Sequence, residues 1–422
     1  MEFYDVQNLE QRYGQARTFY KTQGIDTDKA LSALDAIPIS IQCWQGDDVR
    51  GFTDPDTALS GGIQVTGTYP GRARTAQELQ NDLETVFALI PGPKRLNLHS
   101  IYAECGSSVP RDQLTPSHFS GWVSWAKKLN IALDFNPTLF SHPYADDGLT
   151  LTHPDAEIRG FWIRHCRACR RIGEYFGKEL KSPCIVNIWI PDGFKDIPGN
   201  RAEPRRRLEK SLDEIFSDVY DEKYLIDSIE SKVFGIGSEA YVAGSHEFYM
   251  GYGLSRNKMI CLDLGHFHPE ENVADKISAV IQFSGRVLLH LSRPVRWDSD
   301  HVVILDSSLE ETAREIIRCG SGKIYLALDF FDASINRTAA WIIGTRNARK
   351  ALLFALLDPQ VKLNEASFSF DFTKQLMLFE EAKTWPRNDV WNYYCLQNSV
   401  PPGAQWYDAI LEYERTVLAG RR

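Results

Sequence analysis

Two aspartates stand two residues apart in the stretch HLSRPVRWDSDH, which runs from His290 to His301. In an extended segment, the side chains of residues i and i+2 point the same way, so Asp298 and Asp300 would face a common point. Two carboxylates at short range repel each other unless a cation lies between them. The stretch therefore predicts a bound cation.

Further carboxylates and imidazoles stand where apolar, β-rich runs of the sequence end. Carboxylate and imidazole donors without a thiolate suit divalent manganese, magnesium, cobalt or zinc. Their number exceeds the needs of one ion, so the sequence predicts two divalent cations that share a bridging carboxylate. Together with the aspartate pair, the candidate ligands are Glu230, Asp263, His266, His268, His290, Asp329 and Asp332.

Each candidate ligand also has an explanation that needs no metal. Taken alone, His266 fits a hydrogen-bonded core histidine, Asp263 fits a helix cap, and the aspartate pair fits a solvated loop. These explanations would all have to hold at four neighbouring strand ends. A metal site accounts for the whole set at once, and we favour it.

These residues need a scaffold that brings distant parts of the chain together. Eight short β-rich runs alternate with segments of helical spacing, such as residues 116–129 and 155–177. Alternating strands and helices predict parallel pairing. Eight such units predict an α/β fold, a closed (β/α)₈ TIM barrel with additional N- and C-terminal helices. The predicted strands are residues 39–44, 95–101, 131–137, 184–190, 225–235, 259–267, 286–294 and 323–331.

Polar and ionisable residues gather at the C-terminal ends of the predicted strands, which is where a barrel of this kind places its chemistry. Lys232 follows Glu230 by two residues, so both side chains are expected to face the same way. Besides the candidate ligands, the polar residues at strand ends include His99, Asp134, Asn136, Asn187, Trp189 and Lys232.

The chain on either side of the predicted barrel has a different character. We divide it into an N-terminal helical extension (1–38), the barrel domain (39–345) and a C-terminal helical extension (346–422). The amphipathic C-terminal helices are expected to pack on the barrel or on a neighbouring subunit. The glycine-rich segment 60–75 predicts a loop at the barrel mouth, since the lysine of the alternative, a P-loop phosphate cradle, is absent.

Composition narrows the class of protein. The chain has 422 residues and a formal net charge of −9, which disfavours nucleic-acid binding because phosphate backbones attract clustered cations. The N-terminus lacks the features of a secretory signal, and no apolar run is long enough to span a membrane. Cysteines such as Cys166 and Cys169 fit reduced thiols within helices and strands. A cytoplasmic protein without a nucleic-acid or membrane partner is predicted.

Ten long strings carry a resemblance to a known family. Over nearly its whole length the chain resembles the L-rhamnose isomerases, and more distantly it is similar to the xylose isomerases. The strings are CWQGDDV (43–49), GGIQVTGTYPGRAR (61–74), IPGPKRLNLH (90–99), LDFNP (133–137), NIWIPDG (187–193), ESKVFGIG (230–237), EFYMGY (247–252), LDLGHFHP (262–269), SRPVRWDSDHVV (292–303) and LDFFDASINR (328–337).

The resemblance implies a barrel enzyme that interconverts L-rhamnose and L-rhamnulose, the first step of rhamnose catabolism, as a cytoplasmic homotetramer. It implies two divalent cations, manganese first, with zinc, cobalt or magnesium as alternatives. By this resemblance one cation is held by Glu230, Asp263, His290 and Asp329. The other is held by His266, Asp298 and Asp300, with Asp263 bridging. The positions that match the sugar site are His99, Trp189, Lys232 and Trp44.

Aldose–ketose isomerisation moves one hydrogen between C1 and C2 and one proton between the two oxygens. With both oxygens polarised, a hydride is expected to pass directly from C2 to C1, while Lys232 stabilises charge at the carbonyl oxygen and Trp189 and Trp44 exclude water. The alternative is an enediol route in which Asp329 or Asp332 takes the C2 proton. The predicted catalytic residues are Lys232, Asp329 and His99.

Three other functions fit parts of the pattern: an isomerase of another aldose, a metal-dependent barrel hydrolase or aldolase, and a sugar-binding protein without catalysis. Barrel amidohydrolases favour an H-x-H motif after the first strand, whereas His266 and His268 follow the sixth predicted strand. Sugar binding alone does not need two divalent ions. The isomerase therefore explains the pattern best.

Overall fold

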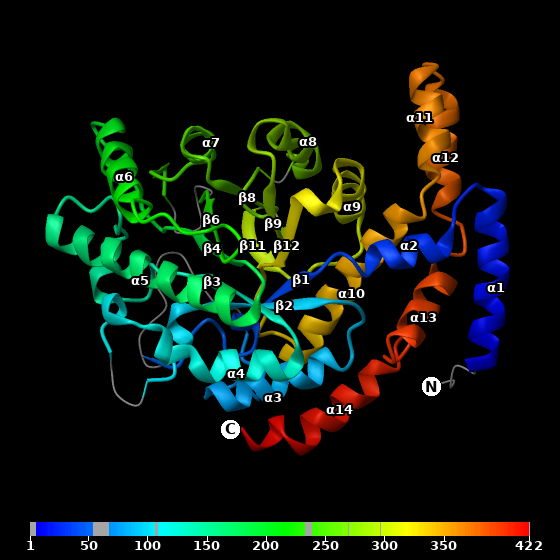
Figure 1. Cartoon of the computed structure of the whole chain (residues 1–422), viewed down its shortest axis with the longest axis horizontal. Coiled ribbons are helices and arrows are strands. Elements are labelled where there is room, and N and C mark those ends of the chain that lie inside the picture. The colour runs from blue at the N-terminus through cyan, green and yellow to red at the C-terminus, as the bar shows by residue number, and fades with distance from the viewer. Residues whose placement is uncertain are drawn as a thin grey trace.

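Eight parallel strands close into a barrel at the centre of the molecule (Figure 1). The structure is a computed structural model, and it describes residues 6–53, 67–105, 109–232, 239–268, 270–295 and 297–421. Around the barrel the strands are β1 (Ile39–Gln42), β2 (Lys94–His99), β3 (Ala132–Asn136), β4 (Cys184–Ile188), β6 (Leu225–Glu230), β8 (Met259–Asp263), β9 (Val287–Leu291) and β12 (Ile324–Leu328). All eight predicted strands and the (β/α)₈ TIM barrel are confirmed.

A helix follows every barrel strand and covers its outer side (Figure 1). These helices are α3 (Ala76–Phe87), α4 (Ser120–Leu129), α5 (Ala156–Leu180), α6 (Ala202–Ile215), α7 (His246–Arg256), α8 (Val273–Ser284), α9 (Ser307–Cys319) and α10 (Arg337–Leu356). Side-chain caps begin several of them: Thr75 accepts from the Glu78 N–H, and Asp306 accepts from the Leu309 N–H. Such caps satisfy backbone donors that the first helical turn leaves unpaired.

Within the described residues, six more α-helices precede and follow the barrel. They are α1 (Val6–Thr22), α2 (Thr27–Leu34), α11 (Gln360–Phe368), α12 (Phe372–Ala382), α13 (Arg387–Gln397) and α14 (Trp406–Thr416). The two ends of the chain pack together, since the rings of Tyr13 on α1 and Tyr393 on α13 are stacked with centroids 3.7 Å apart. Helices α11 and α12 project from the body of the molecule as a pair (Figure 1).

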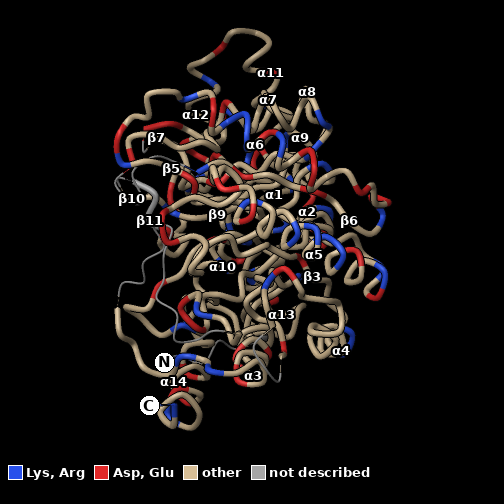
Figure 2. The backbone as a smooth tube through the Cα atoms, turned by 90° about the vertical axis from the view of Figure 1, so that its left-hand side faces the viewer, with Lys and Arg blue, Asp and Glu red and all other residues tan. Residues whose placement is uncertain are grey.

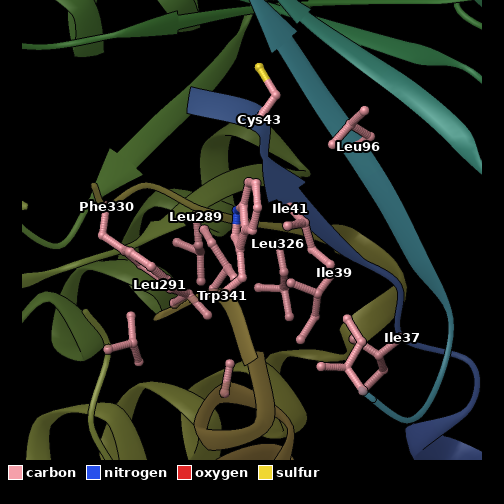
Figure 3. Packing of buried hydrophobic residues seen from close by; sticks show 14 of the residues in the cluster. Ile37, Ile39, Ile41, Cys43, Leu96, Leu289, Leu291, Leu326, Phe330 and Trp341 are labelled. Atoms are coloured by element: carbon pink, nitrogen blue, oxygen red, sulfur yellow. The ribbon is translucent and has the colours of Figure 1, made fainter. Parts of the chain in front are cut away.

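The outer face of the barrel wall is apolar. Ile39 and Ile41 of β1 and Leu326 of β12 pack around Trp341 of α10 (Figure 3). The indole Nε1 of Trp341 donates to the Gln42 carbonyl at 2.7 Å, so even its polar atom is satisfied. Branched aliphatic side chains suit this position because the β pleat presents every second residue to the helices.

The inner face of the barrel is divided into two halves. On the side of β4, β6, β8, β9 and β12, an apolar cluster fills the lower interior; its members are Ile185, Ile226, Met259, Cys261, Leu288 and Ala327. On the side of β1, β2 and β3 the interior is polar: Arg95 forms a two-pronged ion pair with Asp134, at 2.8 and 2.7 Å, and Ser40 donates to the same carboxylate at 2.7 Å. A barrel core of this size is normally packed with side chains.

Two short two-stranded sheets lie at the C-terminal mouth of the barrel. Strand β5 (Gly193–Phe194) pairs with β7 (Tyr241–Val242), and β10 (Arg293–Val295) pairs with β11 (Trp297–His301), both antiparallel. Strand β11 contains the WDSDH stretch, so the predicted strand is present, but Asp300 departs from extended backbone with a φ of 41°. Residues 60–66 of the predicted glycine-rich loop lie outside the described residues, but the Tyr69 N–H donates to the Ala333 carbonyl at 2.8 Å, beside the exit of β12.

Positive and negative side chains are interspersed along the described part of the chain (Figure 2). Among the described residues, no helix is both long enough and apolar enough to cross a membrane. Cys166 and Cys169 are both buried within α5, where burial raises the pKa of each thiol well above its usual value. These two cysteines occupy ordinary helix positions, as the sequence predicts.

Candidate metal centre

Four of the predicted ligands converge at the C-terminal ends of four adjacent strands. Glu230 ends β6 and Asp263 ends β8, while His290 lies in β9 and Asp329 follows β12. Strand register explains the meeting, because Asp263 pairs directly with His290 across β8 and β9. One donor atom from each of the four residues lies within 4.8 Å of the others.

The His290 ring is the centre of this cluster. Its Nδ1 lies 3.0 Å from Asp329 Oδ2, 3.4 Å from Glu230 Oε1 and 3.5 Å from Asp263 Oδ2. Three carboxylates thus point at one side of a single imidazole. An arrangement of this size and composition is that of a divalent cation site.

Neighbouring groups orient two of the carboxylates. The side-chain amide of Asn187 donates to Glu230 Oε2. Asp263 Oδ1 accepts from the Ser292 hydroxyl at 2.8 Å and from the Gly265 N–H at 2.6 Å. Hydrogen bonds of this kind fix the direction in which a metal ligand presents its remaining oxygen.

The remaining oxygens test whether a cation fits. Glu230 Oε1 and Asp263 Oδ2 are buried, yet neither accepts a hydrogen bond from any described residue. Buried carboxylate oxygens without a donor are costly, and a cation is the group that most readily satisfies several of them together. The residues present therefore fit a divalent cation.

The ionisable groups of the cluster are buried close together, and this shifts their pKa values. Burial raises the pKa of Asp329 to about 6, helped by the nearby Asp263 and Glu230 carboxylates and opposed by His290. Burial acts in the same direction on Asp263, but the His266 and His290 rings outweigh it and hold the pKa of Asp263 below its usual value. Burial disfavours charge on His290 too, yet the acidic groups around the ring raise its pKa well above the ordinary value.

The structure describes two of the three further ligands predicted for the second cation. His266 is buried and its Nδ1 lies 3.2 Å from Glu230 Oε1, so it adjoins the four-residue cluster. Asp300 is half-buried in β11, and its backbone carbonyl accepts from the Phe331 N–H at 3.2 Å. The side chain of Asp298 lies outside the described residues.

Lys232 is buried beside the cluster, two residues beyond Glu230. Its ammonium donates to the Pro191 carbonyl at 2.9 Å and forms an ion pair with Glu239 at 2.5 Å. The same ammonium lies 5.9 Å from the ring centroid of Trp189. A buried lysine held in this way provides a fixed positive charge next to the carboxylates.

Aromatic side chains form an arc at the mouth of the barrel that continues from Lys232. Trp44 follows β1, and its ring meets the ring of His99 edge to face with centroids 4.5 Å apart. The ring centroid of Phe140 lies 5.9 Å from that of His99 and 6.0 Å from that of Trp189. Burial lowers the pKa of His99 to about 3, with the nearby His290 and Arg111 acting in the same direction, so its imidazole is neutral near pH 7.

Two candidate ligands, Asp332 and His268, are not part of the four-residue cluster. Asp332 accepts from the N–H and the hydroxyl of Ser334 at 2.7 and 2.6 Å, so its carboxylate closes a turn. His268 is exposed, and its Nδ1 accepts from the Glu270 N–H at 3.2 Å. Spacing alone suggested both residues, but the chain turns away after each strand ends.

The sequence analysis missed three contributors to the site: the orienting donor Ser292, the aromatic Phe140, and the ligand-holding role of Asn187. Ser292 follows His290 by two residues and Asn187 precedes Trp189 by two, so the alternation of a strand carries a signal for both. Phe140 lies in the loop after β3 and has no such signal. Its position depends on Arg111, whose guanidinium holds the Thr138 and Phe140 carbonyls at 3.0 and 2.7 Å.

Known proteins resemble this chain over nearly all of its length. A family model described as "L-rhamnose isomerase (RhaA)" matches residues 7–421. A protein named L-rhamnose isomerase from Yersinia pseudotuberculosis serotype IB (strain PB1/+) is 55% identical over 415 residues, covering 98% of this chain and 99% of its own. Its namesake from Yersinia pestis (strain Pestoides F) is 54% identical over the same length and coverage.

Solved structures resemble the chain more remotely. An L-ribulose 3-epimerase has a TM-score of 0.48 at 12% sequence identity, covering 78% of this chain and 98% of its own. D-Psicose 3-epimerase from Clostridium cellulolyticum H10 has a TM-score of 0.43 at 13% identity, covering 65% of this chain and 91% of its own.

Proposed function

The chain belongs to the L-rhamnose isomerase family, and we propose that it carries out the reversible conversion of L-rhamnose to L-rhamnulose at the barrel mouth. The observation that carries the site is the buried meeting of Glu230, Asp263, His290 and Asp329. Two carboxylate oxygens in it lack donors among the described residues. Adjacent to this cluster, Lys232 can donate a hydrogen bond to a sugar oxygen, and the arc of aromatic rings can cover the C–H faces of the sugar.

We propose that the site holds two divalent cations, with Mn²⁺ first and Zn²⁺, Co²⁺ or Mg²⁺ as alternatives. The first would be held by the four-residue cluster, and the second by His266, Asp298 and Asp300, with Asp263 shared. Cations bound there would supply positive charge that orients the open-chain sugar and polarises its hydroxyl and carbonyl oxygens. The oxygen and imidazole donors of the four-residue cluster support this choice of metals.

The chain's own residues would hold the sugar and exclude water. The Lys232 ammonium is proposed to donate to the oxygen at which negative charge develops, because it is fixed beside the cluster by Glu239 and Pro191. Trp189 and Trp44 would cover the C–H faces of the sugar. Trp189 Nε1 makes no hydrogen bond within the described structure and can donate to a sugar hydroxyl, while neutral His99 can donate or accept through its ring.

We propose that hydrogen moves as a hydride from C2 to C1. Direct transfer needs no strong base at carbon, which suits a site whose carboxylates are proposed to hold cations. In the alternative enediol route, Asp329 or Asp332 would take the C2 proton. Asp329 is favoured because it lies in the four-residue cluster, whereas one oxygen of Asp332 accepts twice from Ser334. Reaction in heavy water separates the routes: substantial deuterium at C1 of the product would rule out direct transfer.

The family resemblance implies a cytoplasmic homotetramer, and an exposed apolar surface supports self-association. Helices α11 and α12 and the turn between them expose large apolar side chains; they are Val361, Phe368, Phe370, Phe372, Leu376 and Met377. Phe368 is 85% exposed, and an apolar patch of this kind on a projecting element is typical of a subunit interface. The division at residues 38 and 345 stays a proposal; residue 345 lies inside α10.

The test is an assay of ketose formation from L-rhamnose by the purified protein. We expect activity that a chelator removes and that added Mn²⁺ restores. Parallel assays with other aldoses would identify an isomerase of different specificity. A protein that binds L-rhamnose yet forms no ketose in the presence of any of the four metals would contradict the proposed reaction.

A further inference from the structure

A space lies inside the barrel, beneath the metal cluster, and it opens at the N-terminal end of the barrel, where Ala36, Pro38 and Gly322 are exposed. It has a volume of about 150 Å³ and extends from residues at the N-terminal end of the barrel up to His290. Pro38 and Ser321 mark its lower end, just before β1 and β12 begin. We call this space the lower chamber.

Apolar side chains line one wall of the lower chamber, and polar side chains line another. Its apolar wall includes Ile185, Leu288 and Ala327, which belong to the apolar cluster of the barrel interior. Its polar wall consists of Ser40, Arg95, Asn97, Asp134, Asn136 and Asn187. A space with one polar wall needs polar contents, whereas an apolar cavity can stay dry.

Three asparagines in the polar wall have unsatisfied oxygens. The Oδ1 atoms of Asn97, Asn136 and Asn187 are buried and accept no hydrogen bond from the described residues. All three residues are less than one-tenth exposed. Three buried acceptors around one small space require a donor inside it.

His290 joins the lower chamber to the metal cluster. Its Nδ1 faces the three carboxylates, whereas Nε2 is fully buried without a hydrogen-bond partner in the described part of the chain. The Cys261 thiol lies within 4.8 Å of donor atoms of Glu230 and His290. Burial raises the pKa of this thiol and its contact with the His290 side chain acts to lower it, but a thiol is a weak acceptor. A histidine that binds a metal through one nitrogen normally donates its other N–H to a strong acceptor.

We propose that the lower chamber holds a cluster of ordered waters, one of which accepts the Nε2–H of His290 and is itself held by the asparagine oxygens. This inference rests on the proposed metal site. Asn97 and Asn136 would then act as positioning residues: through water, they fix the tautomer and orientation of a metal ligand. With about 30 Å³ per water in the liquid, the chamber has room for several molecules.

Charge in the chamber favours water over an ion. The single carboxylate in its wall, Asp134, is neutralised by Arg95 and also accepts from Ser40 and from the Ile185 N–H at 2.9 Å. The other polar groups around the chamber are neutral amides, the His290 ring and the hydroxyl-bearing residues Ser40, Ser321 and Tyr325. A cation would find no free carboxylate in this wall, and an anion would meet three carbonyl oxygens.

The first test is a high-resolution crystal structure of the full protein, without metal and with Mn²⁺. We expect in both an ordered water about 2.7–3.2 Å from His290 Nε2, with further waters on the asparagine oxygens. A dry lower chamber, or an anomalous metal signal inside it, would overturn the inference.

The second test measures Mn²⁺ affinity by calorimetry in variants of the chamber wall. Asn97→Leu fills the chamber and removes an acceptor, so we expect about 10–100-fold weaker binding, the usual loss when an outer partner of a metal ligand is removed. Asn97→Ser keeps a polar atom and leaves room for an extra water, and should bind within about threefold of the wild type.

The matched control is Leu288→Met on the apolar wall, which should leave affinity unchanged. Equal affinity in Asn97→Leu and the wild type would overturn the positioning role. A wild-type protein that binds no metal would instead contradict the proposed function, and the waters of the metal-free crystal would still decide the chamber's contents. If Asn97→Leu does not fold, Asn97→Ser and the crystals carry the test.

Discussion

The outer and inner faces of the barrel wall differ in the polarity of their side chains, although the same strands form both. On the outside, Ile39, Ile41 and Leu289 are fully buried against helices and contain no polar side-chain atom. On the inside, one residue along the same strands, stand Ser40 and His290. A step of one residue reverses the environment because side chains alternate across a strand.

The two sides have different consequences for the protein. The outer side removes apolar surface from water, so each side chain there stabilises the fold. The inner side gathers Glu230, Asp263 and Asp329 where charges repel and oxygens lack donors, which costs stability and prepares a cation site. Stability and activity should therefore be separable by changing one side at a time.

The largest effect is expected from Asp329→Asn on the inner side. Turnover should fall by more than about 1,000-fold, since even one lost charge-stabilising donor costs about 100–1,000-fold. Burial raises the pKa of Asp329 to about 6, above its usual value, so stability falls as the pH rises toward 6, and the whole cost of the ionised form is present above pH 6. At pH 8 the metal-free variant should therefore be no less stable than the wild type, as measured by thermal unfolding.

Asp358→Asn is the control on the outer side. Asp358 pairs with Arg314 and Arg387 among the helices, both at 2.8 Å. Its loss should reduce stability and leave the turnover of folded enzyme unchanged. If both aspartate variants changed activity and stability in parallel, the distinction between the two sides would fail.

Trp341→Ala should produce the largest loss of stability. The indole is fully buried between β1, β12 and α10, and truncation leaves a cavity and an unpaired Gln42 carbonyl. We expect the free energy of unfolding to fall by about 3–5 kcal/mol, measured by denaturant titration. Trp341→Phe should recover part of this, and kcat of the folded fraction should stay near that of the wild type.

Lys232→Met tests the charge at the edge of the site. We expect kcat to fall by about 100–1,000-fold with a smaller change in KM, because the proposed contact strengthens as charge develops. Lys258 is the matched control: it forms a partly buried ion pair with Asp227 at 2.7 Å, away from the cluster. Lys258→Met should leave kcat unchanged, and an equal effect of both variants would argue against the proposed role of Lys232.

The smallest effect concerns acid stability and His165 of α5. Burial lowers the pKa of His165 to about 3, only partly offset by the Arg111 carbonyl that its Nδ1–H meets at 2.8 Å. Between pH 6.5 and 3 the unfolded chain therefore binds a proton that the folded protein does not, and stability falls with falling pH by about 1.4 kcal/mol per unit. His165→Gln should reduce this slope; an unchanged slope in urea titrations at pH 7.5, 6.5 and 5.5 would contradict it.

Much of this architecture could be predicted from the sequence. The runs that became β4, β8 and β9 are dense in Val, Ile and Leu, which fits strands buried on both faces. The ligands Glu230, Asp263 and His290 were recognisable because each ends such a run, and equivalent strand ends meet at one mouth. Asp332 and His268 were misplaced because loop directions depend on turns that a spacing pattern does not encode.

The sequence by itself determined the order of strands and helices, the chemistry of the candidate ligands and the family, because these follow from residue types and their periodicity. Only the tertiary structure decided that Asn97, Asn136 and Asn187 share a chamber with His290. It also decided that Phe140 completes the aromatic arc. The physical reason is closure: residues on opposite strands become neighbours only when the sheet curves back on itself and the register across every pair is fixed.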